Sequence, residues 1–349
     1  MTDPEDPAPE STPLAGPVGP LEIIGRGLDL NVAASSDVRR AAILIGLLAL
    51  AAVGPIVAIL YVDSGQLGVL PMAGDQVDLV ALRARNAVSG VAQLSMLLGT
   101  LCLIALAIDS QLLAVHVIAS RATGRPFSLR AALAVVRIRF WRLARANILV
   151  AVILVVPRLL LEQVVAPRGV VIQAQVVVQV LLDIVLSVPF AYVATWILLG
   201  QVGAREAVRL SWRLARSRPS LALVIAAVNV GFQTIALVAA ASAADILIRT
   251  AEGLGLDHAS GAGLVPLAGL FALAIVAAGS LVVTIAALTV GPQVVAFLRL
   301  TGADGGLAAL HDPDNPFATP RVEPLVTRPM KVVLVIEALL AAFVVAQLA

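Results

Sequence analysis

Seven apolar segments, each near the length of a membrane-crossing helix, constrain the fold of this 349-residue chain more than any other feature. A transmembrane helix needs roughly 20 apolar residues to cross the hydrocarbon layer. The segments lie at 41–62, 94–119, 147–166, 171–200, 219–247, 264–298 and 332–348. They are too long for the strands of a membrane barrel, and a backbone in lipid must satisfy its own hydrogen bonds. The sequence therefore predicts an all-α, polytopic helical membrane protein.

The composition excludes a soluble globular protein, because 60% of the residues are hydrophobic and only 13% are charged. Soluble domains average about 25% charged residues, which supply their polar shell. The single cysteine excludes a disulfide framework. One cysteine and three distant histidines also supply no ligand set for zinc or an iron–sulfur cluster. We expect neither a metal nor another cofactor.

The chain divides by composition into four parts. Residues 1–20 hold six prolines, four acids and no basic residue, which predicts a disordered acidic tail. A helical membrane domain follows at 21–300, then a Pro-rich cytoplasmic linker at 301–330 and a C-terminal transmembrane helix at 331–349. Within the membrane domain, kinks are expected at Pro157, Pro189 and Pro292.

The basic residues predict the orientation of the chain in the membrane. Of the 24, 19 lie in connections on one side and four on the other, while Arg158 lies within a span. Basic residues concentrate on the cytoplasmic side of membrane proteins. We therefore expect a multi-pass protein of the cell membrane with a cytoplasmic N-terminus and, after seven spans, a C-terminus outside.

An internal repeat is suggested by the string Trp-Arg-Leu-Ala-Arg, which occurs at 141–145 and again at 212–216. In both places an Arg-rich amphipathic stretch leads into an apolar span. The matching positions favour a duplicated helical hairpin, at 94–166 and 171–247, over a chance match. The prediction is a six-helix body with a parallel hairpin repeat, plus a seventh C-terminal span.

The second copy of this string also carries a family resemblance. After Pro189, the chain reads Gly203-Ala204-Arg205-Glu206-Ala207-Val208-Arg209-Leu210-Ser211-Trp212-Arg213-Leu214. This run resembles the bacterial and archaeal glycerophosphoryl diester phosphodiesterase membrane-domain-like proteins, over roughly residues 24–300. The resemblance implies a six-helix membrane body, and it names no catalytic residue that can be assigned to a position in this chain. The 349 residues hold no phosphodiesterase domain, so hydrolytic activity is not expected.

Polar residues on the third and fourth spans form one group of candidate site residues. Arg158 and Asp183 lie at similar distances from the outer ends of their spans, so an ion pair across the hairpin is expected. It would either orient two helices or bind a solute or ion. Gln175 and Gln179 precede Asp183 on the same helical face. That stripe would form interhelical hydrogen bonds or line a polar cavity.

A second group lies on the second and fifth spans. On the second span, Asp109 and His116 share a helical face with small residues. On the fifth span, Asn229 lies at a similar depth to Asp109, and Gln233 lies one turn further along the same face as Asn229. We expect Asp109 to be neutral or hydrogen-bonded to this amide pair, with a proton relay through His116 as the alternative. A surface ion pair is expected four residues apart between Asp245 and Arg249.

The Arg-rich connections predict helices that lie in the membrane interface. Along the second connection, the arginines share one face, while Val208, Trp212 and Ala215 are assigned to an apolar face. The alternative is that these charges only determine topology. The candidate residues for contact with lipid head groups are Trp141, Arg142, Arg145, Arg205, Arg209, Trp212, Arg213 and Arg216.

Two functions follow, and no enzyme is expected. Intramembrane protease residues, a Gly-x-Ser-x-Gly turn and a phosphate loop are not found, and the only lysine is Lys331. The favoured hypothesis is an integral membrane protein that organises lipids or partner proteins. Its expected partners are membrane lipids with anionic head groups and a membrane protein or a second copy of the chain. The alternative is a transporter or permease-like protein for a small solute or lipid. A net charge of +2 argues against nucleic acid.

Overall fold

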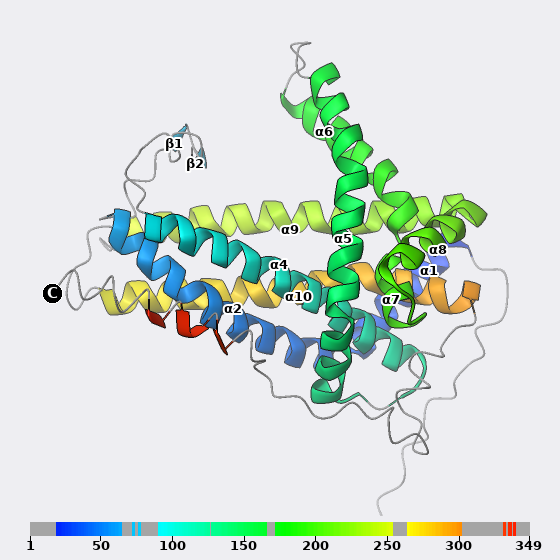
Figure 1. Ribbon diagram of the computed structural model, residues 1–349, viewed down its shortest axis with the longest axis horizontal. Coiled ribbons are helices and arrows are strands. Elements are labelled where there is room, and N and C mark those ends of the chain that lie inside the picture. Colours follow the sequence, from blue (N-terminus) through cyan, green and yellow to red (C-terminus); the bar gives the residue numbers. More distant parts are fainter. Residues whose placement is uncertain are drawn as a thin grey trace, which may run out of the picture. The chain divides into compact units, whose positions relative to one another are not determined.

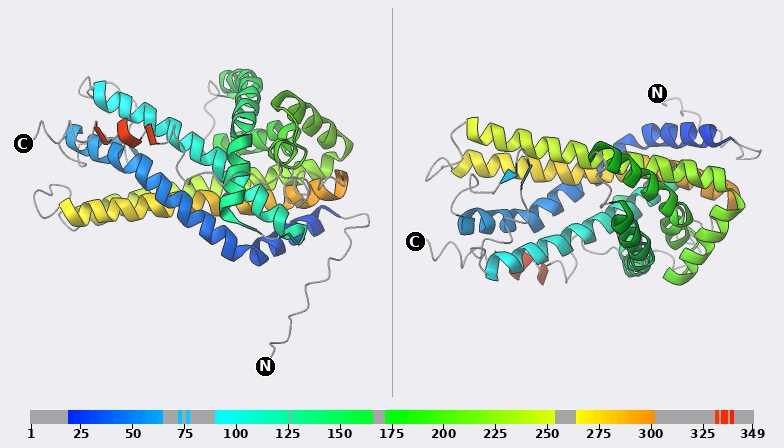
Figure 2. Two further views of the ribbon diagram at one scale, coloured as in Figure 1. Left: turned by 60° about the horizontal axis from the view of Figure 1, so that its bottom comes forward. Right: turned by 90° about the horizontal axis from the view of Figure 1, so that it is seen from above.

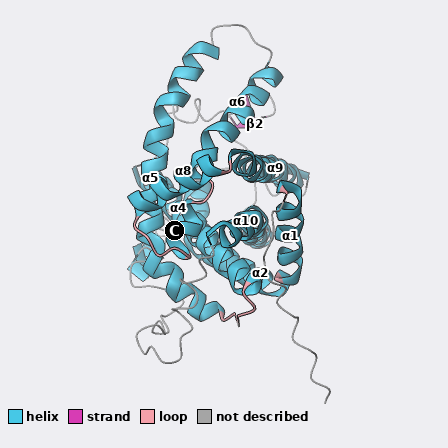
Figure 3. Ribbon diagram, turned by 90° about the vertical axis from the view of Figure 1, so that its right-hand side faces the viewer, coloured by secondary structure: helices cyan, strands magenta, loops and turns pink. Residues whose placement is uncertain are grey.

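The computed structural model is helical along nearly all of its described length (Figures 1 and 3). It describes residues 19–64, 72–73, 76–77, 90–125, 127–165, 172–253 and 264–301, with 331–332, 334–336 and 338–339 near the C-terminus. The helices are α1 (Pro20–Ala33), α2 (Ser35–Ser64), α4 (Gly90–Ala122), α5 (Leu129–Val165), α6 (Ile172–Ser187), the 3₁₀ turn η3 (Val188–Phe190), α7 (Val193–Leu198), α8 (Ala204–Ser217), α9 (Pro219–Gly253) and α10 (Leu264–Thr301). One antiparallel pair, β1 (Met72–Ala73) with β2 (Gln76–Val77), lies in a connection. The predicted all-α class is confirmed.

Six described stretches are long and apolar enough to cross a membrane. They are Ser35–Ile56, Leu97–Ala122, Leu129–Pro157, Val177–Leu198, Pro219–Ala236 and Ala268–Thr301. Each overlaps one of the first six predicted spans, which confirms the polytopic helical architecture. The predicted seventh span, at 332–348, lies mostly outside the described residues and stays a prediction, as do the acidic tail and nearly all of the Pro-rich linker.

The three prolines expected to kink spans differ in their effect on the backbone. Pro157 and Pro292 lie inside the continuous helices α5 and α10. Pro189 instead lies in η3, where α6 stops and the chain turns before α7. Proline has no N–H and its ring crowds the preceding turn, so a break at such a position is expected. The fourth span is therefore a broken helix.

The chain packs into two compact units. Unit 1 comprises Met1–Val38, Gln111–Phe232 and Ala286–Val322, and unit 2 comprises Arg39–Ser110, Gln233–Ile285 and Glu323–Ala349. The core of unit 1 is apolar, and its largest fully buried side chains include Leu112, Leu113, Ile118, Leu143, Tyr192, Ile197 and Phe297.

In unit 2, α2 and α10 approach closely at a pair of glycines, and both helices can be followed in Figure 2. A Cβ added at Gly46 would lie 2.6 Å from the Val276 carbonyl oxygen. One added at Gly279 would lie 2.9 Å from Gly46 Cα. Beside this contact, Ser280 Oγ donates a hydrogen bond of 3.1 Å to the Ala42 carbonyl. Small residues with a hydroxyl bond are typical of packing between membrane helices.

In unit 1, a second glycine contact joins α1 to the C-terminal part of α10. A Cβ on Gly27 would lie 2.5 Å from Pro292 N, and one on Gly291 would lie 2.6 Å from the Gly27 carbonyl oxygen. That oxygen accepts a hydrogen bond of 2.8 Å from Asn31 Nδ2, and the Asn31 side chain is buried. The backbone of α1 therefore lies directly against α10.

The two segments assigned to the repeat differ at two prolines. Helix α5 runs without a break through its Arg-rich part into its apolar part, whereas α8 ends before Pro219 and α9 begins there. The residue 71 positions before Pro219 is Ile148, which continues a helix. Likewise, Pro189 breaks the fourth span where the earlier segment has Ile118. The duplication itself stays a prediction.

Candidate functional site

Helix α8 is the most strongly amphipathic element of unit 1. It begins after Gly203, whose backbone is extended, and it ends at Ser217, because the next residue, Arg218, precedes a proline and has left the helical conformation. Its buried residues, Ala207, Ser211 and Ala215, are spaced by four and therefore lie on one face. This face packs against η3, α7 and α5.

The opposite face of α8 is basic and exposed. At 100° per residue, its four arginines fall within a sector of roughly 80°. All four are exposed: Arg205, Arg209, Arg213 and Arg216. Glu206 lies 3.0 Å from Arg209 Nη2, so four arginines against one glutamate leave a net charge of +3 on the helix.

Trp212 lies beside these arginines, which corrects its assignment to the apolar face. Its side chain is 51% exposed, and its ring makes an edge contact with Phe190 at 6.4 Å between centroids. The helical angle places it next to Arg205 and Arg216, so the buried face consists of small residues instead. An exposed tryptophan flanked by arginines is typical of a helix at the membrane interface.

Ser211 connects α8 to the break in the fourth span. Its Oγ accepts a hydrogen bond of 3.1 Å from the Tyr192 N–H and donates one of 2.8 Å to the Pro189 carbonyl. The turn after Pro189 has lost its regular helical partners, and backbone groups at such breaks must be satisfied by neighbouring side chains. Ser211 is fully buried, so it supplies this role from the protein interior.

Helix α5 also contacts the connection that leads into α8. Arg142 Nη1 donates a hydrogen bond of 3.1 Å to the carbonyl of Gln201, a residue with a left-handed φ of 53°. Arg142 is thus half-buried and turned towards the protein. The other predicted interfacial residues of α5, Trp141 and Arg145, are exposed, and Arg145 Nε donates to the Trp141 carbonyl at 3.1 Å.

The candidate residues of the second and fifth spans differ widely in burial. On α4, Asp109 is 7% exposed and His116 is 2% exposed, and the His116 ring lies 6.1 Å from that of Phe127. On α9, Asn229 is half-buried and Gln233 is exposed. The burial of Asp109 and His116 agrees with a helix face turned away from lipid, while their hydrogen bonding to the α9 amides stays a prediction.

The predicted pairing of Arg158 with Asp183 involves a side chain outside the described part of the structure. Arg158 lies on α5, but its side chain lies outside the described part, as does that of Gln175 on α6. Asp183 is half-buried and Gln179 is exposed. The ion pair and the polar stripe therefore stay predictions.

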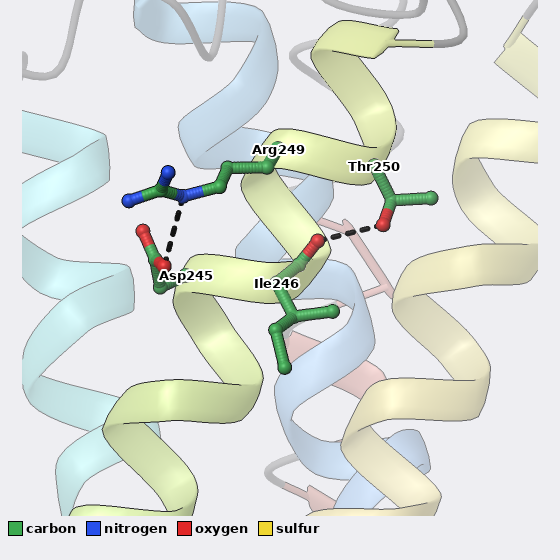
Figure 4. A network of polar contacts seen from close by, with 4 residues as sticks. All are labelled: Asp245, Ile246, Arg249 and Thr250. Atoms are coloured by element: carbon green, nitrogen blue, oxygen red, sulfur yellow. Dashed lines mark hydrogen bonds and ion pairs between the residues drawn. The ribbon is translucent and has the colours of Figure 1, made fainter.

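The expected pair on α9 is confirmed. Arg249 Nε donates to Asp245 Oδ2 at 2.9 Å, and the two side chains are 67% and 43% exposed, respectively. Figure 4 shows this pair one turn apart beside the Thr250 hydroxyl, which donates to the Ile246 carbonyl at 2.7 Å. The exposure of both groups makes this a surface contact of small energetic weight.

Several buried polar residues of unit 1 were missed by the sequence analysis. Ser211 was read only as part of a motif, although Pro189 signalled that the neighbouring backbone would need partners. Tyr192 and Gln293 are buried, and their side-chain oxygens have no hydrogen-bond partner among the described residues. Arg299 was counted only among the 19 basic residues predicted on the cytoplasmic side, yet its guanidinium is buried at the end of α10. Within the described residues, no three His, Cys, Asp or Glu side chains are grouped to hold a metal ion.

The apolar helices and the basic face of α8 define a class of protein. The chain is a multi-pass, helical integral membrane protein that exposes an arginine-rich amphipathic helix. Comparison with protein-family models, curated proteins and solved structures finds no match to the chain. The resemblance to the glycerophosphoryl diester phosphodiesterase membrane-domain-like proteins therefore stays a prediction.

Proposed function

We propose that this protein is a non-enzymatic membrane protein that gathers anionic lipids around α8 on the cytoplasmic side of the cell membrane. The observation that carries the proposal is the division of α8 into a buried face of small residues and an exposed face with four arginines and Trp212. Interfacial helices of this composition bind anionic head groups through their basic residues. Because Ser211 and the small residues fix the buried face, the arginines are presented in one direction.

Two further features favour a lipid partner over the alternative that the arginines serve only to set the orientation of the chain in the membrane. Arg145 and Trp141 on α5 are exposed, which repeats the pairing of an arginine with an interfacial tryptophan. In addition, α8 carries a net charge of +3 within 14 residues, more than is needed to orient one hairpin.

Mass spectrometry of lipids retained after gentle detergent purification tests the proposal. The Arg213→Gln, Arg216→Gln double variant removes two charges from the exposed face of α8. A matched control, Arg121→Gln with Arg130→Gln, removes two exposed arginines on the same predicted side but outside α8. Each basic residue near an anionic surface contributes about 1 kcal/mol, so the α8 variant should lose up to roughly thirtyfold in anionic-lipid preference.

The control variant should retain most of that preference. Equal lipid profiles for the wild type and the α8 variant would contradict the proposal. So would an equal loss in both variants, because it would show that any exposed positive charge serves as well as the face of α8.

A transporter is the second candidate, and the burial of Asp109 and His116 on α4 favours it. Ionisable residues inside membrane helices often mark a proton or solute pathway. Its test is solute or proton flux into liposomes that contain the wild type, compared with Asp109→Asn. Flux that Asp109→Asn abolishes would favour transport over lipid organisation.

A further inference from the structure

A second basic site lies at the end of α10, where Arg299 approaches the first turn of α1. The Arg299 side chain is 7% exposed, and its Nη1 lies 3.9 Å from Glu22 Oε1. That separation is too long for a hydrogen bond. Nε and Nη1 of Arg299 are buried and have no hydrogen-bond acceptor among the described residues. Buried charged donors are costly unless an acceptor meets them, so this guanidinium calls for a further partner.

The neighbouring charges leave this site positive. Glu22 Oε1 also lies 3.1 Å from Arg26 Nη2, so one carboxylate is shared by two guanidinium groups. Glu22 and Arg26 are about half exposed, at 48% and 45%. The cluster therefore carries two positive charges against one negative charge, and it opens outwards through Glu22 and Arg26.

The helix termini explain part of this arrangement but not the unsatisfied donors. Arg299 occupies the last turn of α10, where a positive charge is favoured by the helix dipole, and Glu22 occupies the first turn of α1, where a negative one is favoured. These preferences account for the signs of the charges. They provide no acceptor for the buried N–H groups of Arg299.

We propose that Arg299 and Arg26 bind a phosphate group at this junction of α1 and α10. A tetrahedral phosphate presents oxygens in several directions, so one oxygen can accept from Arg299 while another accepts from Arg26. Guanidinium groups are suited to phosphate because their charge-assisted N–H donors are fixed in one plane. Glu22 is half exposed and turns outwards when the anion enters. A lipid head group and a soluble phosphate ester share this chemistry.

The site is separate from α8, so this inference does not rest on the proposed function. All three of its residues lie in unit 1 on α1 and α10, and none belongs to the exposed face of α8. A variant of one site therefore keeps all the residues of the other.

Thermal unfolding of the detergent-purified full chain tests the phosphate site. One arm adds inorganic phosphate against chloride at equal ionic strength, and a second arm adds short-chain phosphatidylglycerol. Both arms use wild type, Arg299→Gln, Glu22→Gln and the matched control Arg249→Gln, which removes an exposed arginine that is also paired with a carboxylate and lies outside α8. We expect a stabilising shift in the wild type and in the control. Arg299→Gln should weaken the apparent affinity roughly tenfold or more, because it removes charged donors to the ligand.

Glu22→Gln should raise the affinity for phosphate, because it removes the carboxylate that competes for the two guanidinium groups. This variant tests the phosphate site even if Arg299→Gln does not fold. A response to inorganic phosphate that Arg299→Gln weakens identifies a soluble ligand, and a response to phosphatidylglycerol alone that Arg299→Gln weakens identifies a head group. Either of these Arg299-dependent responses supports the site. It is refuted if neither probe stabilises the wild type, if Arg299→Gln responds like the wild type, or if Glu22→Gln leaves the affinity unchanged or lower. The Arg213→Gln, Arg216→Gln variant should keep the part of the response that depends on Arg299, so failure of the lipid proposal is recognised separately.

Discussion

Replacing Ser211 by alanine should destabilise unit 1 by removing both hydrogen bonds that join α8 to the broken fourth span. The Tyr192 N–H is buried, so losing its acceptor carries the cost of an unsatisfied donor, about 1–3 kcal/mol. The Pro189 carbonyl is half-buried and can bond to water instead, so losing its hydrogen bond to Ser211 costs about 0.5–1.5 kcal/mol of stability. The hydroxyl is small and leaves little void. The sum predicts a loss of about 1.5–4.5 kcal/mol.

Equilibrium unfolding in mixed detergent micelles measures this change. The control is Ser217→Ala on the same helix, because Ser217 is exposed and its Oγ donates only to the Leu214 carbonyl at 2.7 Å. That variant should change stability by less than about 0.5 kcal/mol. Hydrogen exchange adds a local readout, since the Tyr192 amide should exchange faster in Ser211→Ala and not in Ser217→Ala.

Equal stability of Ser211→Ala and Ser217→Ala would contradict this prediction. Destabilisation of Ser211→Ala with full protection of the Tyr192 amide would also contradict it, because the loss of stability would then arise elsewhere. A confirmed result would show that the basic face of α8 is positioned by the break at Pro189.

Three further predictions concern packing, surface charge and orientation. Gly279→Leu should lower the free energy of unfolding by about 1–3 kcal/mol or more, because the new side chain would meet the backbone of Gly46. Gly231→Leu should have a smaller effect, because a Cβ added there meets nothing within 4 Å. Thermal unfolding compares the two variants. Asp245→Asn should cost less than about 1 kcal/mol in the same assay, since its ion pair is exposed, and a larger loss would show that the pair is not a simple surface contact. A reporter active only in the cytoplasm should fail when inserted in the 63–90 connection, and activity there would reverse the predicted orientation.

Features that depend on residues close together in the sequence were predictable. The six spans follow from the length of apolar segments, and the pair of Asp245 with Arg249 follows from a spacing of four on a helix. The basic face of α8 follows from the same spacing. The position of Trp212 was also available from the angle of 100° per residue, so that error was one of interpretation rather than of missing information.

Features that depend on a distant partner were not predictable. The close contact of Gly46 with Gly279 requires knowing that α2 and α10 meet, and the chain holds 26 glycines without marking this pair. The burial of Arg299 depends on α1, which lies more than 260 residues earlier. Similarly, Pro189 predicts a disturbed helix, but only the fold shows that Ser211 supplies the missing partners.

Fluorescence quenching of Trp212 by brominated lipids tests the lipid-binding claim most directly. The parent protein for this measurement carries Trp141→Phe and Trp196→Phe, which leave Trp212 as its only tryptophan. It is reconstituted into lipid bilayers. Brominated phosphatidylglycerol should quench Trp212 more strongly than brominated phosphatidylcholine at equal mole fraction, because the adjacent arginines attract the anionic lipid. Replacing Arg213 and Arg216 by glutamine should remove most of this difference. Equal quenching by the two lipids in the parent protein, or a preference that survives the loss of both arginines, would contradict the proposal that α8 gathers anionic lipids.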